Sequence, residues 1–83
     1  MKNIRIRYFA SVREALGSGE TLQTEAETLA QLRDELIARG APHAAALARG
    51  KAVRMALDQV MRGEDASLAD GSEVAFFPPV TGG

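Results

Sequence analysis

The chain has 83 residues, the length of one small domain, which removes only about 60% of its unfolded surface from water. Ten basic and eleven acidic residues leave a net charge of -1, so nucleic acid and an anionic membrane surface are poor candidate partners. No apolar run approaches the roughly 20 residues of a membrane span, and the N-terminus lacks a signal-peptide pattern. We therefore expect a cytoplasmic location.

Residues for metal or thiol chemistry are scarce. The absence of cysteine excludes a disulfide framework, a thiolate metal site and a cysteine nucleophile. The one histidine, His43, has no second ligand nearby in the sequence and is interpreted as an ordinary residue of a loop or short helix. We expect no metal and no stably bound cofactor.

The first part of the chain predicts two strands and a short helix between them. Apolar and polar residues alternate over residues 2–9, the period of a half-buried strand. Residues 11–16 can form a short helix with Ser11 near its N-cap, and a second strand follows over residues 20–24. The first strand is expected to face the core with Ile4, Ile6 and Tyr8.

One long amphipathic helix is predicted from Thr28 to Gly40. Thr28 and Gln31 fit the capping-box pattern, in which two side chains satisfy amides at the helix start. Apolar residues then recur at helical spacing, so this helix is expected to cover one face of a sheet. The stripe consists of Leu29, Leu32, Leu36 and Ile37.

The second half predicts a short helix over residues 42–49, a strand over residues 53–57 with a short return segment at residues 60–61, and a last strand over residues 73–77. The resulting order of strand, strand, helix, strand, strand predicts an α+β fold in which a mixed sheet packs on one main helix.

The sheet face opposite the helix is expected to lack a cover. Phe9, Ala56, Ala75 and Phe77 would point to this face, where small and aromatic side chains gather near the C-terminus. An exposed apolar patch of this kind indicates a partner surface. Crowding by loops is the alternative interpretation.

The C-terminal segment predicts a thin tail that leaves the sheet. Pro78 and Pro79 end the last strand because neither can donate a hydrogen bond to it. Residues 78–83 could reach roughly 20 Å beyond the domain. Gly82 and Gly83 lack a Cβ atom and could pass through a narrow channel.

The group expected to react is the α-carboxylate of Gly83. It is ionised at neutral pH, with an ordinary pKa of about 3.3–3.7, and is a poor acyl electrophile. Adenylylation by ATP would activate it, and a sulfur donor could convert the acyl-adenylate into a thiocarboxylate. We therefore divide the chain into a domain of residues 1–77 and a flexible diglycine tail of residues 78–83.

Two segments resemble a known family. Residues 9–14 read Phe-Ala-Ser-Val-Arg-Glu, and residues 70–83 read Asp-Gly-Ser-Glu-Val-Ala-Phe-Phe-Pro-Pro-Val-Thr-Gly-Gly. Both are similar to the small sulfur-carrier subunits of molybdopterin synthase, which are ubiquitin-like β-grasp proteins related to the thiazole-pathway sulfur carrier. The likeness covers essentially the whole chain and departs at Asp58, where the family often has asparagine.

The resemblance implies a role in molybdenum cofactor biosynthesis. A ubiquitin-activating-like adenylyltransferase would adenylylate Gly83 with ATP, and a sulfurtransferase would supply the sulfur. The thiocarboxylate would then donate its sulfur to cyclic pyranopterin monophosphate inside the large subunit, within a heterotetramer of two small and two large subunits. The catalytic side chains are expected in the large subunit, so the chain would not be an enzyme on its own.

The same resemblance assigns Phe9, Arg13 and Phe77 to the partner surface. It also implies a path into the partner formed by Pro78, Pro79, Val80, Thr81 and Gly82. Three alternatives stay open: a ubiquitin-like modifier joined through Gly83, a thiazole-pathway sulfur carrier, and a β-grasp module that binds without reacting. The helical segment at residues 42–49 and the Phe-Phe-Pro-Pro run favour the molybdopterin branch over the thiazole branch.

Overall fold

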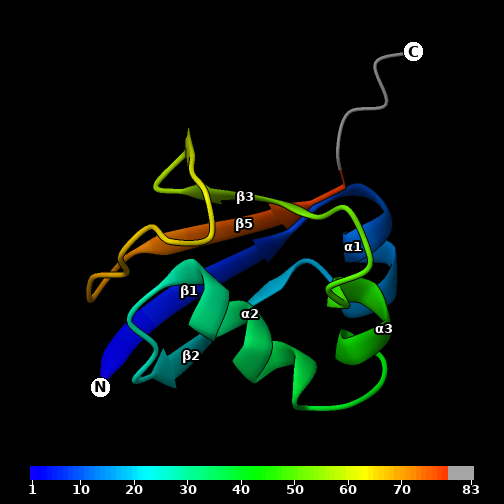
Figure 1. Ribbon diagram of the computed structural model, residues 1–83, viewed down its shortest axis with the longest axis horizontal. Helices are drawn as coiled ribbons and strands as arrows, with labels where there is room; N and C mark the ends of the chain where they lie inside the picture. Colours follow the sequence, from blue (N-terminus) through cyan, green and yellow to red (C-terminus); the bar gives the residue numbers. More distant parts are fainter. Residues whose placement is uncertain (79–83) are drawn as a thin grey trace.

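The structure is a computed structural model that describes residues 1–78. One five-stranded sheet packs on the main helix, and two shorter helices lie at the end of the sheet near Pro78 (Figure 1). The strands are β1 (Lys2–Tyr8), β2 (Gly19–Thr24), β3 (Arg54–Leu57), β4 (Val60–Met61) and β5 (Glu73–Phe77). The helices are α1 (Ala10–Leu16), α2 (Leu29–Ile37) and α3 (His43–Leu47).

The sheet is mixed, with the strand order β2-β1-β5-β3-β4. β1 and β5 are parallel neighbours at the centre, and the other strand pairs are antiparallel. This arrangement confirms the predicted α+β fold of the ubiquitin-like β-grasp type. Because β1 and β5 run in the same direction with Tyr8 beside Phe76, both strands end at the same edge of the sheet.

The core lies between the sheet and α2, as the two apolar periods predict. Alternate residues of β1 and β5 are buried because successive side chains of a strand point to opposite faces. The Tyr8 and Phe76 rings stack with their centroids 6.1 Å apart. The side chains that reach the core from the strands and α2 include Ile4, Ile6, Tyr8, Met55, Val74, Phe76, Leu29, Leu32 and Leu36.

The starts of α2 and α1 differ, because side chains cap the backbone amides only at α2. At α2, Thr28 Oγ1 accepts from the Gln31 amide at 3.2 Å, and Gln31 Oε1 accepts from the Glu27 amide at 2.7 Å, so the predicted capping pair is confirmed but reaches one residue further back. At α1 the N-cap is Phe9 and makes no side-chain cap bond. The expected N-cap near Ser11 is therefore wrong, because α1 begins at Ala10 and its N-cap, Phe9, lies two residues before Ser11.

Candidate functional site

The predicted tail leaves the domain at Pro78, directly after β5. Pro78 is half-buried and is the last residue that the structure describes. The remaining predicted tail residues lie outside the described residues: Pro79, Val80, Thr81, Gly82 and Gly83. The surfaces that surround Pro78 are therefore the described part of the site.

Two aromatic side chains stand beside the root of the tail, as the sequence predicts. Phe9 follows β1 and Phe77 ends β5, and the Phe9 amide donates to the Phe76 carbonyl at 3.1 Å. The two rings meet edge to face, with centroids 6.4 Å apart and an angle of 84° between their planes. The Arg7 guanidinium lies 5.4 Å from the centre of the Phe9 ring, a cation–π distance. Phe9 remains 38% exposed, so this pair presents apolar surface to solvent.

A tight strand-to-helix turn holds Phe9 in this position. The Phe9 carbonyl accepts from the amides of Val12 and Arg13 at 3.1 and 3.2 Å, which anchors the first turn of α1. Ala10 adopts a left-handed φ of 52°, which is uncommon for a residue with a Cβ atom. Arg13, the third predicted partner residue, is exposed one turn into α1. The structure therefore brings Phe9 and Phe77 into contact and places Arg13 on the adjoining helix.

Strand register extends the apolar surface along the uncovered sheet face. Directly paired residues point to the same face, so Ala75 lies beside Ala56 on β3 and beside Arg7 on β1. Met61 on β4 pairs with Ala56 and is 53% exposed. The position of Met61 could not be predicted from the sequence, because it depends on a register between strands that alternation within one strand does not reveal. We use the name "uncovered sheet surface" for Phe9, Met61, Ala75 and Phe77; Ala56 points to the same face between Ala75 and Met61 but is only 8% exposed.

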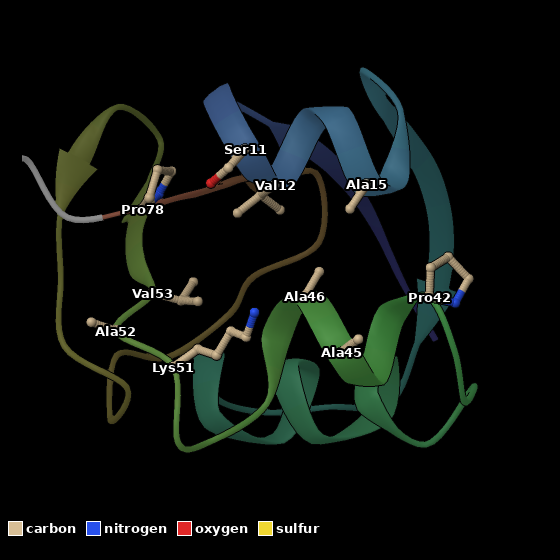
Figure 2. A pocket seen from close by; sticks show the side chains of 10 residues that line it. All are labelled: Ser11, Val12, Ala15, Pro42, Ala45, Ala46, Lys51, Ala52, Val53 and Pro78. Atoms are coloured by element: carbon tan, nitrogen blue, oxygen red, sulfur yellow. The ribbon is translucent and has the colours of Figure 1, made fainter.

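A groove of about 410 Å³ lies between α1 and α3 and reaches Pro78 (Figure 2). Small residues leave the space open: Ala15 projects from α1, while Ala45 and Ala46 project from α3. One lining residue carries a charge, Lys51. The complete lining is Ser11, Val12, Ala15, Pro42, Ala45, Ala46, Lys51, Ala52, Val53 and Pro78. We call this cavity the α1/α3 groove; it was not predicted from the sequence.

A buried arginine fixes the chain that forms one wall of this groove. Arg33 is only 3% exposed, and its guanidinium donates to the carbonyls of Leu47 and Ala48 at 2.8 Å and of Lys51 at 3.2 Å. Burial lowers the pKa of this guanidinium, which stays charged because arginine does not lose its proton in proteins. The connection from α3 to β3 is therefore held by one side chain of α2.

A second polar cluster joins β1, β2 and the residues that follow α2. The Tyr8 hydroxyl donates to Glu20 Oε2 at 3.2 Å, and Arg39 donates to both Glu20 oxygens at 2.8 and 2.9 Å. Burial, and then the adjacent Glu20 carboxylate, raises the pKa of the Tyr8 phenol. Burial alone would raise the pKa of Glu20, but the bonds from Arg39 and Tyr8 outweigh it and lower that pKa. His43 begins α3 with Nε2 3.6 Å from Glu20 Oε2, in the short helix expected for it.

Within residues 1–78, His, Asp and Glu side chains do not form a group of three or more that could hold a metal ion. Over the same residues, the structure contains no helix with both the length and the apolar character needed to cross a membrane.

Comparison with known proteins identifies the family. Residues 6–83 match the ThiS family. The chain belongs to the ThiS family. Among relatives, the molybdopterin synthase sulfur carrier subunit of Escherichia coli (strain K12) is 42% identical over 81 residues, which cover 96% of this chain and 99% of that protein. The family resemblance stated from the sequence is thereby confirmed.

Solved structures share the fold of this ThiS-family chain. Small archaeal modifier protein 1 of H. volcanii superposes with a TM-score of 0.75 at 20% identity, covering 96% of this chain and 100% of that chain. A second solved structure is the complex of subunits 1 and 2 of molybdopterin-converting factor from Helicobacter pylori 26695. Its matching chain superposes with a TM-score of 0.66 at 23% identity, and the match covers 98% of this chain and 99% of that chain.

Proposed function

We propose that this ThiS-family chain is the sulfur-carrier subunit of a molybdopterin synthase and carries its sulfur as a thiocarboxylate on Gly83. The observation that carries the proposal is the 42% identity, over nearly the full length of both chains, to a relative of that name. The family match also includes the segment on which this chemistry depends, because the matched residues run through the diglycine to residue 83.

The chemistry on Gly83 follows from the poor reactivity of a carboxylate. A carboxylate oxygen attacks the α-phosphorus of ATP, the bond to pyrophosphate breaks, and an acyl-adenylate forms. Hydrosulfide, delivered by a sulfurtransferase, then attacks the carbonyl carbon, and AMP leaves. The resulting thiocarboxylate is a sulfur nucleophile: its sulfur would bond a carbon of cyclic pyranopterin monophosphate as an oxygen substituent leaves that carbon, and hydrolysis of the thioester so formed would leave the sulfur on the pterin and return Gly83 to a carboxylate. ATP is thus a substrate of the activating adenylyltransferase and not a resident cofactor of this chain.

The uncovered sheet surface is the docking area that this proposal requires. Phe9 is exposed and Phe77 is half-buried at the root of the tail, and Arg13 adds a cation on the adjoining helix. Partially exposed aromatic residues with arginine are typical of the energetically dominant part of an interface. The large subunit of molybdopterin synthase is the partner we assign, supported by the solved complex of molybdopterin-converting factor subunits 1 and 2 from Helicobacter pylori. The catalytic side chains then belong to that large subunit.

Genetic complementation tests the proposal and separates it from the thiazole pathway. The gene should restore molybdoenzyme activity in a strain that lacks the small subunit of molybdopterin synthase, and it should not restore growth of a thiazole-carrier mutant without thiamine. Deletion of Gly83 should abolish the rescue, whereas a module that only binds would keep it. Rescue of the thiazole mutant alone would overturn the proposal.

The modifier alternative has a specific observation behind it, the likeness in fold to small archaeal modifier protein 1. A modifier would leave tail remnants on lysines of other proteins. Tryptic digests of cell extract should therefore lack peptides that carry such a remnant if Gly83 serves only as a sulfur carrier.

A further inference from the structure

Pro78 belongs to two surfaces at once. Phe77, the preceding residue, contacts Phe9 on the uncovered sheet face. Pro78 lines the α1/α3 groove, on the side of the sheet where the helices lie. The chain thus leaves the domain between the uncovered sheet surface and the groove.

The length of the tail constrains how close a receiving protein must come. Five residues follow Pro78, and a fully extended chain of five spans at most roughly 17 Å. An active site that takes up Gly83 therefore lies within that distance of Pro78. A specific interface covers about 800 Å² on each partner, so surface adjacent to Pro78 falls within the reach of the receiving protein.

The chemistry of the groove selects what can occupy it. Its walls are mostly alanine, proline and valine, and Lys51 supplies the charge. Figure 2 shows the Lys51 side chain pointing its nitrogen into the groove. No carboxylate of residues 1–78 forms an ion pair with this lysine. An apolar side chain with a carboxylate next to it would fill the hollow and pair with the cation.

The groove is also formed before any partner arrives. Arg33 holds the carbonyls of Leu47, Ala48 and Lys51, so the backbone that carries Lys51 needs no rearrangement on binding. A preformed pocket lowers the ordering cost of association.

We propose that the α1/α3 groove is a second docking surface for the large subunit that receives the tail, and that it takes an apolar side chain of that subunit flanked by an aspartate or glutamate. This inference rests on the proposed function, since it requires a protein that takes up the tail. The large subunit would then hold the root of the tail from two sides, with the uncovered sheet surface on one and the groove on the other.

Amine labelling tests the groove without a substitution. The chain has two lysines, Lys2 and Lys51, and Lys51 is the one that lines the groove. Lys2 begins β1, at the end of the sheet away from Pro78, and serves as the internal control. The full chain, free and in complex with the large subunit, is acetylated with a limiting amine reagent and analysed by mass spectrometry. We expect Lys51 to react at least about fivefold more slowly in the complex and Lys2 to react equally in both. Equal rates for Lys51 would overturn the inference.

A matched pair of variants provides the second measurement. Lys51→Glu should weaken the complex about tenfold by placing like charges together, whereas Lys2→Glu should bind within about twofold of the original chain. Equal affinities of the two variants would overturn the groove as a docking surface. Sulfur transfer is followed in the same samples to separate the two proposals. If product forms but Lys51 is not protected from acetylation, the groove as a docking surface is refuted and the proposed function stands. If no complex forms with the large subunit, the proposed function is refuted.

Discussion

Replacement of Arg33 by methionine should destabilise the domain by about 3 kcal/mol, because it removes a buried cation that bonds three backbone carbonyls. Methionine retains most of the aliphatic volume, so the change measures lost hydrogen bonds more than a cavity. The bonds to Leu47 and Ala48 are both 2.8 Å, and the third, to Lys51, is 3.2 Å.

The magnitude follows from what remains after the substitution. Each carbonyl left without a donor costs about 1–3 kcal/mol where water cannot replace the guanidinium, and the three losses are not additive because one side chain makes all three bonds. The ion pair from Arg33 to Glu64, at 3.7 Å, adds little because the Glu64 side chain is 40% exposed. For a domain of this size, about 3 kcal/mol corresponds to a fall in Tm of at least about 12 °C.

Equilibrium unfolding in urea measures this effect, with Arg49→Met as the matched control. Arg49 bonds Asp34 at 2.8 Å, the Ala30 carbonyl at 3.1 Å and the Glu64 carboxylate, but its side chain is 43% exposed and water can replace these bonds, so its loss should cost about 1 kcal/mol. The urea midpoint should fall for Arg33→Met with an unchanged m-value. A loss for Arg33→Met no larger than that of the control would refute the role assigned to Arg33.

Two further predictions concern the aromatic end of the sheet. Phe77→Ala should weaken binding to the large subunit about thirtyfold in calorimetry, since it removes half of the Phe9–Phe77 pair. The control, Gln23→Ala, lies on β2 away from Pro78 and should leave binding unchanged. Equal effects of the two substitutions would argue against the docking area. Tyr8→Phe should cost about 1 kcal/mol at neutral pH by removing the bond to Glu20. The pKa of Tyr8 is raised in the folded chain. The stability that Tyr8 contributes is therefore complete below the unfolded pKa of about 10 and is lost as the pH rises above that value towards the raised folded pKa. Unfolding curves at increasing alkaline pH should thus converge for Tyr8→Phe and the original chain, and a constant difference would contradict this assignment.

The elements that could be predicted from the sequence are those whose burial repeats with a regular period. β1 and β5 alternate between core and surface, and α2 carries its stripe at helical spacing, so their positions and buried faces were predicted correctly. α2 ends at Ile37, three residues before the predicted end, because Gly40 closes a turn by donating to the Ile37 carbonyl at 3.0 Å.

Features that depend on contacts between distant segments escaped prediction. Arg33 lies four residues after Leu29 and three before Leu36, on the buried side of α2, although arginine is seldom fully buried unless it is paired. Arg33 can be buried because the carbonyls of Leu47, Ala48 and Lys51 accept its hydrogen bonds. These residues lie far from Arg33 in the sequence and come close to it only in the folded chain. The α1/α3 groove likewise needs both helices in place before its alanines define a hollow.

Intact-mass spectrometry of the chain tests the central claim most directly. The purified protein is incubated with its activating adenylyltransferase, ATP and a sulfur donor, in parallel with a variant that lacks Gly83. Sulfur carriage predicts a mass increase equal to the exchange of one oxygen for sulfur, located by fragmentation at Gly83 and absent from the variant and from samples without ATP. An unchanged mass, in a system that loads sulfur onto a known carrier, would contradict the account.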